Sequence, residues 1–130
     1  MNLVRDYKNK KKTSEEQISN GVKILHKELA KEKWFQLSLC EQLGNIGSEV
    51  SRALHWKDKD QNNFEGAIVR ALELFDLTLK DLRWKKRLKE IARARELFCD
   101  AITGGEEYKS SLENLDRYFF YYALCARRNM

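Results

Sequence analysis

The stretch WFQLSLCEQLGNIGSEVSRALHWK, residues 34–57, decides the fold of this chain. Its main apolar residues recur at spacings of four, three, four and three: Leu39, Leu43, Ile46, Val50 and Ala53. This spacing places them along one face of an α-helix. Glycine and serine residues lie among them, so neighbouring helices can approach closely. We therefore expect this stretch to form the central helix of the protein.

The composition is that of one globular helical domain. The chain has 130 residues, of which 42% are hydrophobic and 35% charged, and it contains no proline. Because proline breaks helix interiors, its absence suits long uninterrupted helices. No apolar run reaches the roughly 18 residues that a membrane span needs, and the N-terminus lacks the apolar core of a secretory signal. We expect a cytoplasmic protein without membrane contact.

The N-terminal region divides into a tail and the start of the domain. Residues 1–12 form a basic tail, and a single helical-bundle domain is expected over residues 13–130. Thr13 or Ser14 can cap a first helix. Since residues 32–35 contain no turn signal, this helix should run on, or bend only slightly, into the central helix.

Polar loops and capping residues predict the remaining helices. We expect them over residues 62–81, 83–103 and 110–128. Asn62 with Glu65 and Ser110 with Glu113 have capping-box spacing, and the glycine pair after Thr103 ends the helix over residues 83–103. Short connections between helices favour an all-α fold, an antiparallel four-helix bundle with an N-terminal helical extension.

Positive charge is concentrated in residues 80–95, which we call the basic ridge. The ridge has eight basic residues against Asp81 and Glu90, in a chain of net charge +5. Lys86, Lys89 and Arg93 have the spacing of one helical surface. Such a surface could neutralise phosphates, or it could simply be a solvated bundle face. The residues predicted to bind nucleic acid are Arg83, Lys85, Lys86, Arg87, Lys89 and Arg93.

Residues 118–122, YFFYY, form an aromatic run in the last predicted helix. Successive helical residues turn by about 100°, so these side chains cannot all face one core. Exposed aromatic residues are typical of protein interfaces, and they could also stack on unpaired bases. Burial beneath the N-terminal extension is the third interpretation. We predict an oligomer interface that contains Tyr118, Phe120 and Tyr121.

Nothing in the sequence indicates catalysis, a metal site or a cofactor. The three cysteines, Cys40, Cys99 and Cys125, form no CxxC pair, and only two histidines, His26 and His55, accompany them. We interpret the cysteines as small buried hydrophobic residues in a reducing compartment. Nucleophile signatures and glycine-rich phosphate loops are also absent from the chain. The prediction is a protein that is not an enzyme.

Two segments resemble a family of small four-helix-bundle proteins. Residues 45–53, NIGSEVSRA, and residues 64–72 are similar to a helix pair in the ribosomal-RNA intervening-sequence proteins and the accessory variability determinants of diversity-generating retroelements. Ile46, Gly47 and Ala53 match the family pattern, whereas Glu49 and Arg52 depart from it. The resemblance implies a basic ring-like oligomer, commonly a pentamer, that binds RNA or DNA and a reverse transcriptase. A rival similarity, over residues 63–70 and 79–82, is to the helical partners of minimal nucleotidyltransferases.

These observations predict a non-catalytic accessory protein that oligomerises through its last helix and binds nucleic acid through the basic ridge. The alternative is a protein-binding or antitoxin-like helical module whose charge only keeps it soluble. Glu41, Glu49 and Arg52 in the central helix are expected to form internal salt bridges or hydrogen bonds. The working surfaces are therefore expected outside residues 34–57.

Overall fold

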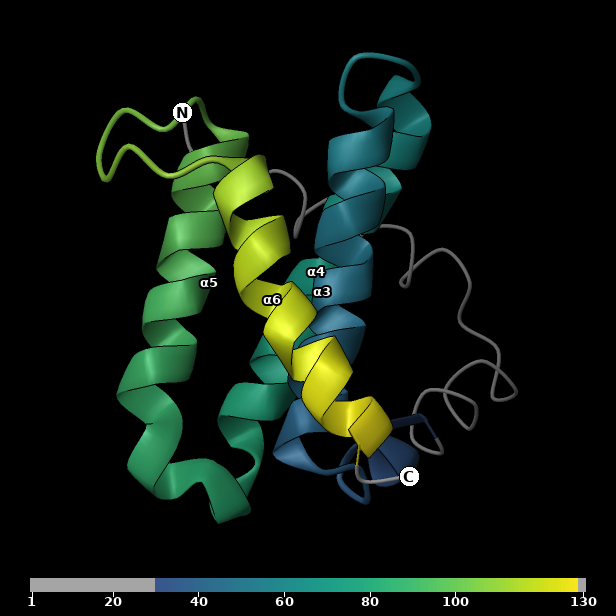
Figure 1. Cartoon of the computed structure of the whole chain (residues 1–130), viewed down its shortest axis with the longest axis vertical. Helices are drawn as coiled ribbons and strands as arrows, with labels where there is room; N and C mark the ends of the chain where they lie inside the picture. Colours follow the sequence, from purple (N-terminus) through teal and green to yellow (C-terminus); the bar gives the residue numbers. More distant parts are fainter. Residues whose placement is uncertain (1–29, 129–130) are drawn as a thin grey trace, which may run out of the picture.

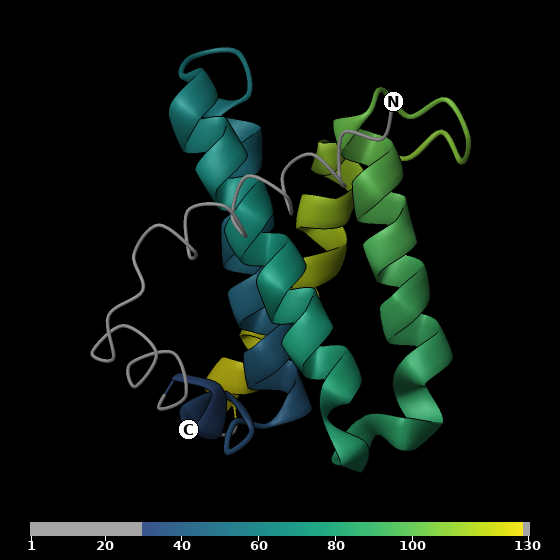
Figure 2. The same ribbon diagram turned by 180° about the vertical axis from the view of Figure 1, so that it is seen from behind.

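The computed structural model describes residues 30–128, and over this part of the chain it is an all-α bundle without strands, as predicted. Its elements are α3 (Leu39–Trp56), α4 (Gln61–Lys80), the 3-10 helix η1 (Leu82–Arg87), α5 (Leu88–Ile102) and α6 (Leu112–Arg128). The long helices run alternately up and down, with α6 crossing diagonally beside α3 (Figure 1). Figure 2 shows α4 covering α3 from the other side. The basic tail and most of the predicted first helix lie outside the described residues.

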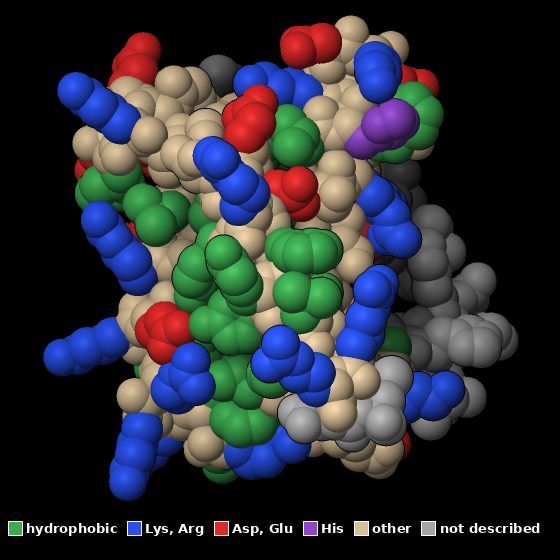
Figure 3. Space-filling model, in the orientation of Figure 1, with side chains coloured by type: hydrophobic (Ala, Val, Ile, Leu, Met, Phe, Trp, Pro, Cys, Tyr) green, Lys and Arg blue, Asp and Glu red, His purple; other side chains and the backbone are tan. Residues whose placement is uncertain are grey.

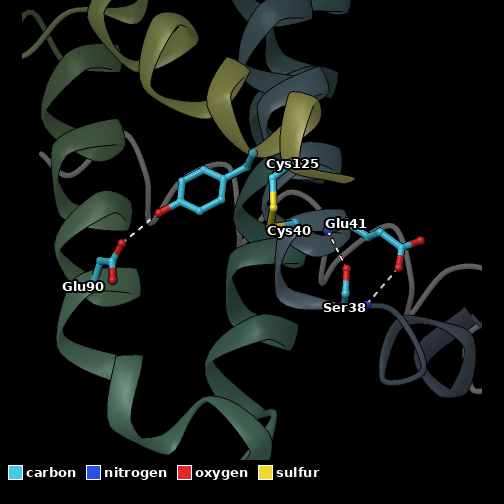
Figure 4. The surroundings of a disulfide bond; sticks show 6 residues. Ser38, Cys40, Glu41, Glu90 and Cys125 are labelled. Atoms are coloured by element: carbon cyan, nitrogen blue, oxygen red, sulfur yellow. Dashed lines mark hydrogen bonds between the residues drawn. A yellow bond between two sulfur atoms is a disulfide. The ribbon is translucent and has the colours of Figure 1, made fainter. Parts of the chain in front are cut away.

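The central helix begins later than predicted. A helical turn that includes residues 31–34 ends before Ser38, which caps α3. The Ser38 hydroxyl accepts a hydrogen bond from the Glu41 amide at 3.1 Å, and the Glu41 carboxylate accepts one from the Ser38 amide at 3.1 Å (Figure 4). This reciprocal capping box satisfies donors that a helix start leaves unpaired. The prediction that the first helix runs on, or bends only slightly, into the central helix is therefore wrong, because residues 35–38 are not helical.

Small residues bring α3 and α6 into close contact. A Cβ atom at Gly47 would lie 2.6 Å from the Phe119 Cβ, and one at Gly44 would lie 3.3 Å from the Ala123 Cα. At Gly47 only glycine leaves room for this approach, and at Gly44 a Cβ would make a tight contact with the backbone of α6. We call this contact the α3–α6 seam, and it confirms the expectation that neighbours approach the central helix closely.

The core lies between the four long helices. Leu43, Ile46, Val50 and Ala53 of the predicted stripe are buried. Phe75 of α4 packs against Phe98 of α5 and Phe119 of α6, with ring centroids 5.9 and 5.8 Å apart. No described helix has the length and apolarity that would let it cross a membrane.

The loop between α5 and α6 is organised by Asp100, a buried residue near the end of α5. Its carboxylate accepts hydrogen bonds from the amides of Glu107, Tyr108 and Ser110 and from the Ser110 hydroxyl. Burial alone would raise the pKa of Asp100, but these hydrogen bonds hold it below the ordinary value. Ser110 thus serves the loop, and Ser111 accepts from the Asn114 amide at 3.2 Å at the start of α6.

The predicted cap of α4 is also displaced. Asp60, rather than Asn62, is the N-cap, and its carboxylate accepts a hydrogen bond from the Asn63 amide at 3.1 Å. The helix consequently begins at Gln61, one residue before the predicted start.

Candidate functional site

The basic ridge lies on an elbow, η1, and on the first half of α5. Asp81 ends α4 and also caps η1, where its carboxylate accepts a hydrogen bond from the Arg83 amide. Trp84 interrupts the helical backbone inside η1, and α5 starts only at Leu88. The prediction of one helix over residues 83–103 is therefore wrong at its start.

A buried glutamine of α3 holds this elbow in place. The Gln42 side chain donates to Asp81 at 3.0 Å and to the Trp34 carbonyl at 2.8 Å, and it accepts from the Trp84 indole at 2.8 Å. Gln42 is completely buried. We call this group of contacts the Gln42 hub. It fixes the end of α4, the elbow and the segment before α3 with respect to one another.

Asp81 also anchors the first arginine of the ridge. The Arg83 guanidinium donates to both carboxylate oxygens, at 3.0 and 2.7 Å, and to the Leu37 carbonyl at 2.7 Å. It stacks over the Trp84 ring, 4.4 Å from its centroid. The hydrogen bond from Arg83 holds the pKa of Asp81 below its ordinary value, against the effect of burial. Arg83 therefore has a structural role at the elbow.

All six residues predicted to bind nucleic acid are exposed, but they fall into two classes. Each arginine is held by a carboxylate: Arg83 by Asp81, Arg87 by Glu90 at 2.8 Å, and Arg93 by Glu96 at 3.7 Å. Arg93 also lies 4.4 Å from the centroid of the Tyr108 ring. The lysines, by contrast, form no ion pair with any residue between 30 and 128: Lys85, Lys86 and Lys89.

The ridge is not one continuous helical surface. Lys86 belongs to η1, whereas Lys89 and Arg93 are four residues apart on α5 and share one of its faces. In Figure 3, Lys and Arg side chains project along the edge of the molecule where α5 lies. The positive surface therefore bends around the elbow and continues along α5.

The aromatic run divides between the core and the surface, as helical geometry predicted. Phe119 is 1% exposed, whereas Phe120 and Tyr121 are 58% and 72% exposed. Tyr118 is 36% exposed, and its hydroxyl donates to Glu90 of α5 at 3.2 Å. Figure 3 shows hydrophobic side chains gathered over α6, with Lys and Arg around them. Of the three predicted interface residues, Phe120 and Tyr121 are exposed on the surface of α6, while Tyr118 hydrogen-bonds to α5 of the same bundle.

Glu90 connects the aromatic run to the basic ridge. One of its oxygens accepts from the Tyr122 hydroxyl at 2.8 Å, and the other accepts from Arg87 at 2.8 Å. The hydrogen bond from Arg87, followed by that from Tyr122, lowers the pKa of Glu90 to about 2. Burial raises the pKa of Tyr118 and of Tyr122. Glu90 is therefore a carboxylate, and both tyrosines are neutral donors, at any ordinary pH.

A groove of about 410 Å³ lies where α5, the Asp100 loop and α6 meet. Apolar Ala94, Leu97 and Leu115 contribute to its lining together with Arg93, Tyr108 and Tyr118. The groove was not predicted, because Tyr108 reaches it from a loop whose path depends on Asp100. The groove lies between the α5 part of the basic ridge and α6, the helix that contains the aromatic run.

The cysteines differ from their predicted state. Cys40 at the start of α3 and Cys125 near the end of α6 form a disulfide, with their Cα atoms 5.8 Å apart (Figure 4). Only Cys99 remains a thiol among the residues that the structure describes, and it is partly buried. The interpretation of all three as small buried hydrophobic residues is therefore wrong for two of them. Sequence spacing gave no signal, because the pair is 85 residues apart.

The described residues offer no group of three or more His, Cys, Asp or Glu side chains arranged to hold a metal ion. His55 is exposed, and its ring meets that of Trp56 edge-on with centroids 4.7 Å apart. His26 lies outside the described residues. Glu49, by contrast, behaves as predicted, since its buried carboxylate pairs with Arg52 and, at 3.1 Å, with Arg70 of α4.

No family model matches this chain, and no curated protein or solved structure is similar enough to count as a match.

Proposed function

We propose that this protein is a non-catalytic accessory protein that binds nucleic acid through the basic ridge and self-associates through the outer face of α6. The observation that carries the proposal is the state of Lys85, Lys86 and Lys89. They are exposed on and beside an elbow that the Gln42 hub holds, and no described acid neutralises them. Lysine ammonium groups that project from a rigid backbone can bind the phosphates of a polyanion.

The arginines of the basic ridge have carboxylate partners among the described residues and the lysines do not, and this difference favours one kind of binding. Arginine forks that read base edges must be free to make two parallel hydrogen bonds. Arg83 and Arg87 already donate hydrogen bonds to carboxylates, and Arg93 forms a looser ion pair of 3.7 Å. Lysines act as point charges toward phosphates. The proposal is therefore contact with the RNA or DNA backbone, independent of sequence and sensitive to salt.

Self-association is supported by the open surface of Phe120 and Tyr121. Aromatic residues are enriched in protein interfaces, and Lys and Arg surround this patch in Figure 3. The resemblance to the retroelement accessory proteins adds a ring-like oligomer, commonly a pentamer, with a reverse transcriptase as partner. In such an assembly, repeated copies of the basic ridge would bind one polyanion together.

The test compares two matched lysine pairs. Lys85→Ala with Lys86→Ala removes the elbow charges, and Lys57→Ala with Lys59→Ala removes exposed charges from the loop between α3 and α4, at the opposite end of α4. Affinity for short labelled RNA and DNA is measured by fluorescence anisotropy over a series of salt concentrations. The elbow pair should weaken binding by about tenfold at low salt and reduce the salt slope by about 0.7–0.9 per lost contact. The control pair should bind as the natural chain does.

Two results would contradict nucleic-acid binding: no binding at low salt, or an affinity that does not change with salt. Light scattering of the same samples tests self-association, for which a monomeric mass at high protein concentration is the opposing result. Because alanine at exposed lysines changes stability by only about 0.5 kcal/mol, both pairs should melt with the natural chain. Loss of binding would then reflect charge rather than unfolding.

A second candidate is a protein-binding or antitoxin-like module. It is favoured by the same engaged arginines, since a ridge whose arginines are satisfied within the bundle can serve mainly for solubility. This candidate predicts a stable complex with a different protein. It also predicts that substituting either lysine pair has no effect in the nucleic-acid binding assay.

A further inference from the structure

The two halves of α6 are held to the bundle in different ways. Leu112, Leu115 and Phe119 in its first half are buried in the core. After Phe119, none of the described residues of α6 has a buried side chain. Burial of apolar side chains is the main source of helix attachment. The last turns of α6 therefore have much less packing to hold them than the first.

The disulfide lies in this weakly packed half. Cys125 is three residues before the last residue of α6, and Cys40 is the second residue of α3. Both cysteines are only partly buried. Figure 4 shows the bond joining the end of one helix to the start of the other. The disulfide therefore attaches α3 to the half of α6 that has no buried side chains among its described residues.

We propose that the Cys40–Cys125 disulfide is a reducible clasp that fastens residues 124–128 to α3. A dithiol reductant opens it by ordinary exchange: a thiolate of the reductant attacks one sulfur, the S–S bond breaks, and the second thiol resolves the mixed disulfide. Two electrons pass to the cysteines, each cysteine sulfur gains a proton, and the reductant leaves as a disulfide. Opening the clasp frees the last turns of α6.

The structure also limits how far the opening spreads. Tyr122 is tied to Glu90 at 2.8 Å, and Phe119 packs against Gly47 in the α3–α6 seam. These contacts do not depend on the disulfide. Ala123 also lies against Gly44 in the same seam. Residues 112–123 therefore stay helical after reduction, while residues 124–128, which include Arg127 and Arg128, open locally.

The consequence for function rests on the proposed self-association. Phe120 and Tyr121 lie within the turn of α6 that precedes the segment that opens. A helix that ends in a frayed turn presents this aromatic surface less rigidly, and an interface weakens when binding must first order its residues. The clasp would thus favour self-association in the oxidised protein and weaken it in the reduced protein.

Hydrogen exchange followed by mass spectrometry tests the clasp on the full chain. Oxidised protein, dithiothreitol-reduced protein and the Cys125→Ser variant are compared, with Cys99→Ser as the control because it alters the thiol outside the disulfide. Exchange in residues 124–128 should be about tenfold faster, or more, in the reduced protein and in Cys125→Ser. Residues 112–119 should be unchanged, and Cys99→Ser should behave as the oxidised chain.

Equal protection of residues 124–128 in the oxidised and reduced natural chain would overturn the proposal, and this measurement remains available if Cys125→Ser does not fold. An air-oxidised chain whose intact mass shows no loss of two hydrogen atoms would also overturn it. Light scattering separates the two proposals. A monomer in both redox states contradicts self-association, whereas the change in exchange tests the clasp alone.

Discussion

The α3–α6 seam and the elbow that carries the basic ridge are held together by opposite means. In the seam, Gly44 and Gly47 provide space, and the backbone of one helix meets the other directly. At the elbow, Gln42 and Asp81 provide hydrogen bonds, and every buried side-chain polar atom of the described residues has a partner. The seam depends on the absence of side chains at two glycines, whereas the elbow depends on hydrogen bonds between specific groups.

This difference suits what each region supports. Close packing without directional bonds resists any added volume, which is appropriate for a scaffold. A hydrogen-bonded hub fixes orientation, because donors and acceptors must meet at set distances and angles. The exposed lysines of the elbow are therefore presented from a defined backbone, although they themselves touch no described acid. The surface proposed to bind nucleic acid depends on polar contacts beneath it.

The largest expected effect comes from adding volume to the seam. Gly47→Val places atoms where Phe119 already lies, since even a Cβ would be 2.6 Å from the Phe119 Cβ. The helices must separate, and the free energy of unfolding should fall by about 3 kcal/mol. Urea denaturation measures the change.

Gly66→Ala in α4 is the control for this prediction. Its Cβ would meet only the flexible end of Arg70, at 3.2 Å. The gain in helix propensity should leave the protein as stable as before or about 1 kcal/mol more stable. If Gly66→Ala lowered the free energy of unfolding as much as Gly47→Val, the contact between α3 and α6 would not be unusually close.

A smaller effect is expected from the hub. Gln42→Met keeps the volume but leaves the Trp84 indole N–H and the Trp34 carbonyl without their partner. An unsatisfied buried group costs about 1–3 kcal/mol, so we expect a loss near 2 kcal/mol. Gln36→Met, at an exposed position, should change stability by no more than about 0.5 kcal/mol. If the two variants were equally stable, the elbow would not depend on α3.

The smallest effect concerns the link between the aromatic run and the ridge, and it depends on pH. The pKa of Glu90 is lowered from 4.5 to about 2, so its contribution to stability is complete above pH 4.5 and disappears as the pH falls toward 2. Because the side chain is 42% exposed, solvent screening limits this contribution to about 1 kcal/mol.

Thermal unfolding of Glu90→Gln and the natural chain across this pH range measures the contribution. The difference between them should shrink as the pH falls. Glu96→Gln, which removes a more exposed pair of 3.7 Å, should have an effect of only a few tenths of a kcal/mol. A Glu90→Gln deficit that stayed constant down to the lowest pH would contradict the role of the carboxylate charge.

The sequence was informative wherever one helix face decides the outcome. The stripe through Leu43, Ile46 and Val50 predicted burial because its period is that of a helix. The alternation within the aromatic run followed from the same geometry. The start of α3 was also readable, since Ser38 and Glu41 have capping-box spacing, but the absence of a glycine or proline signal concealed it.

By itself, then, the sequence determined the helical class, the central stripe and the concentration of charge in residues 80–95, because these depend on composition and local period. Tertiary structure alone decided the rest. It paired Cys40 with Cys125, placed Arg70 against Glu49, and divided the ridge into held arginines and available lysines. Each of these depends on which helices become neighbours, and a local pattern carries no information about distance across the fold.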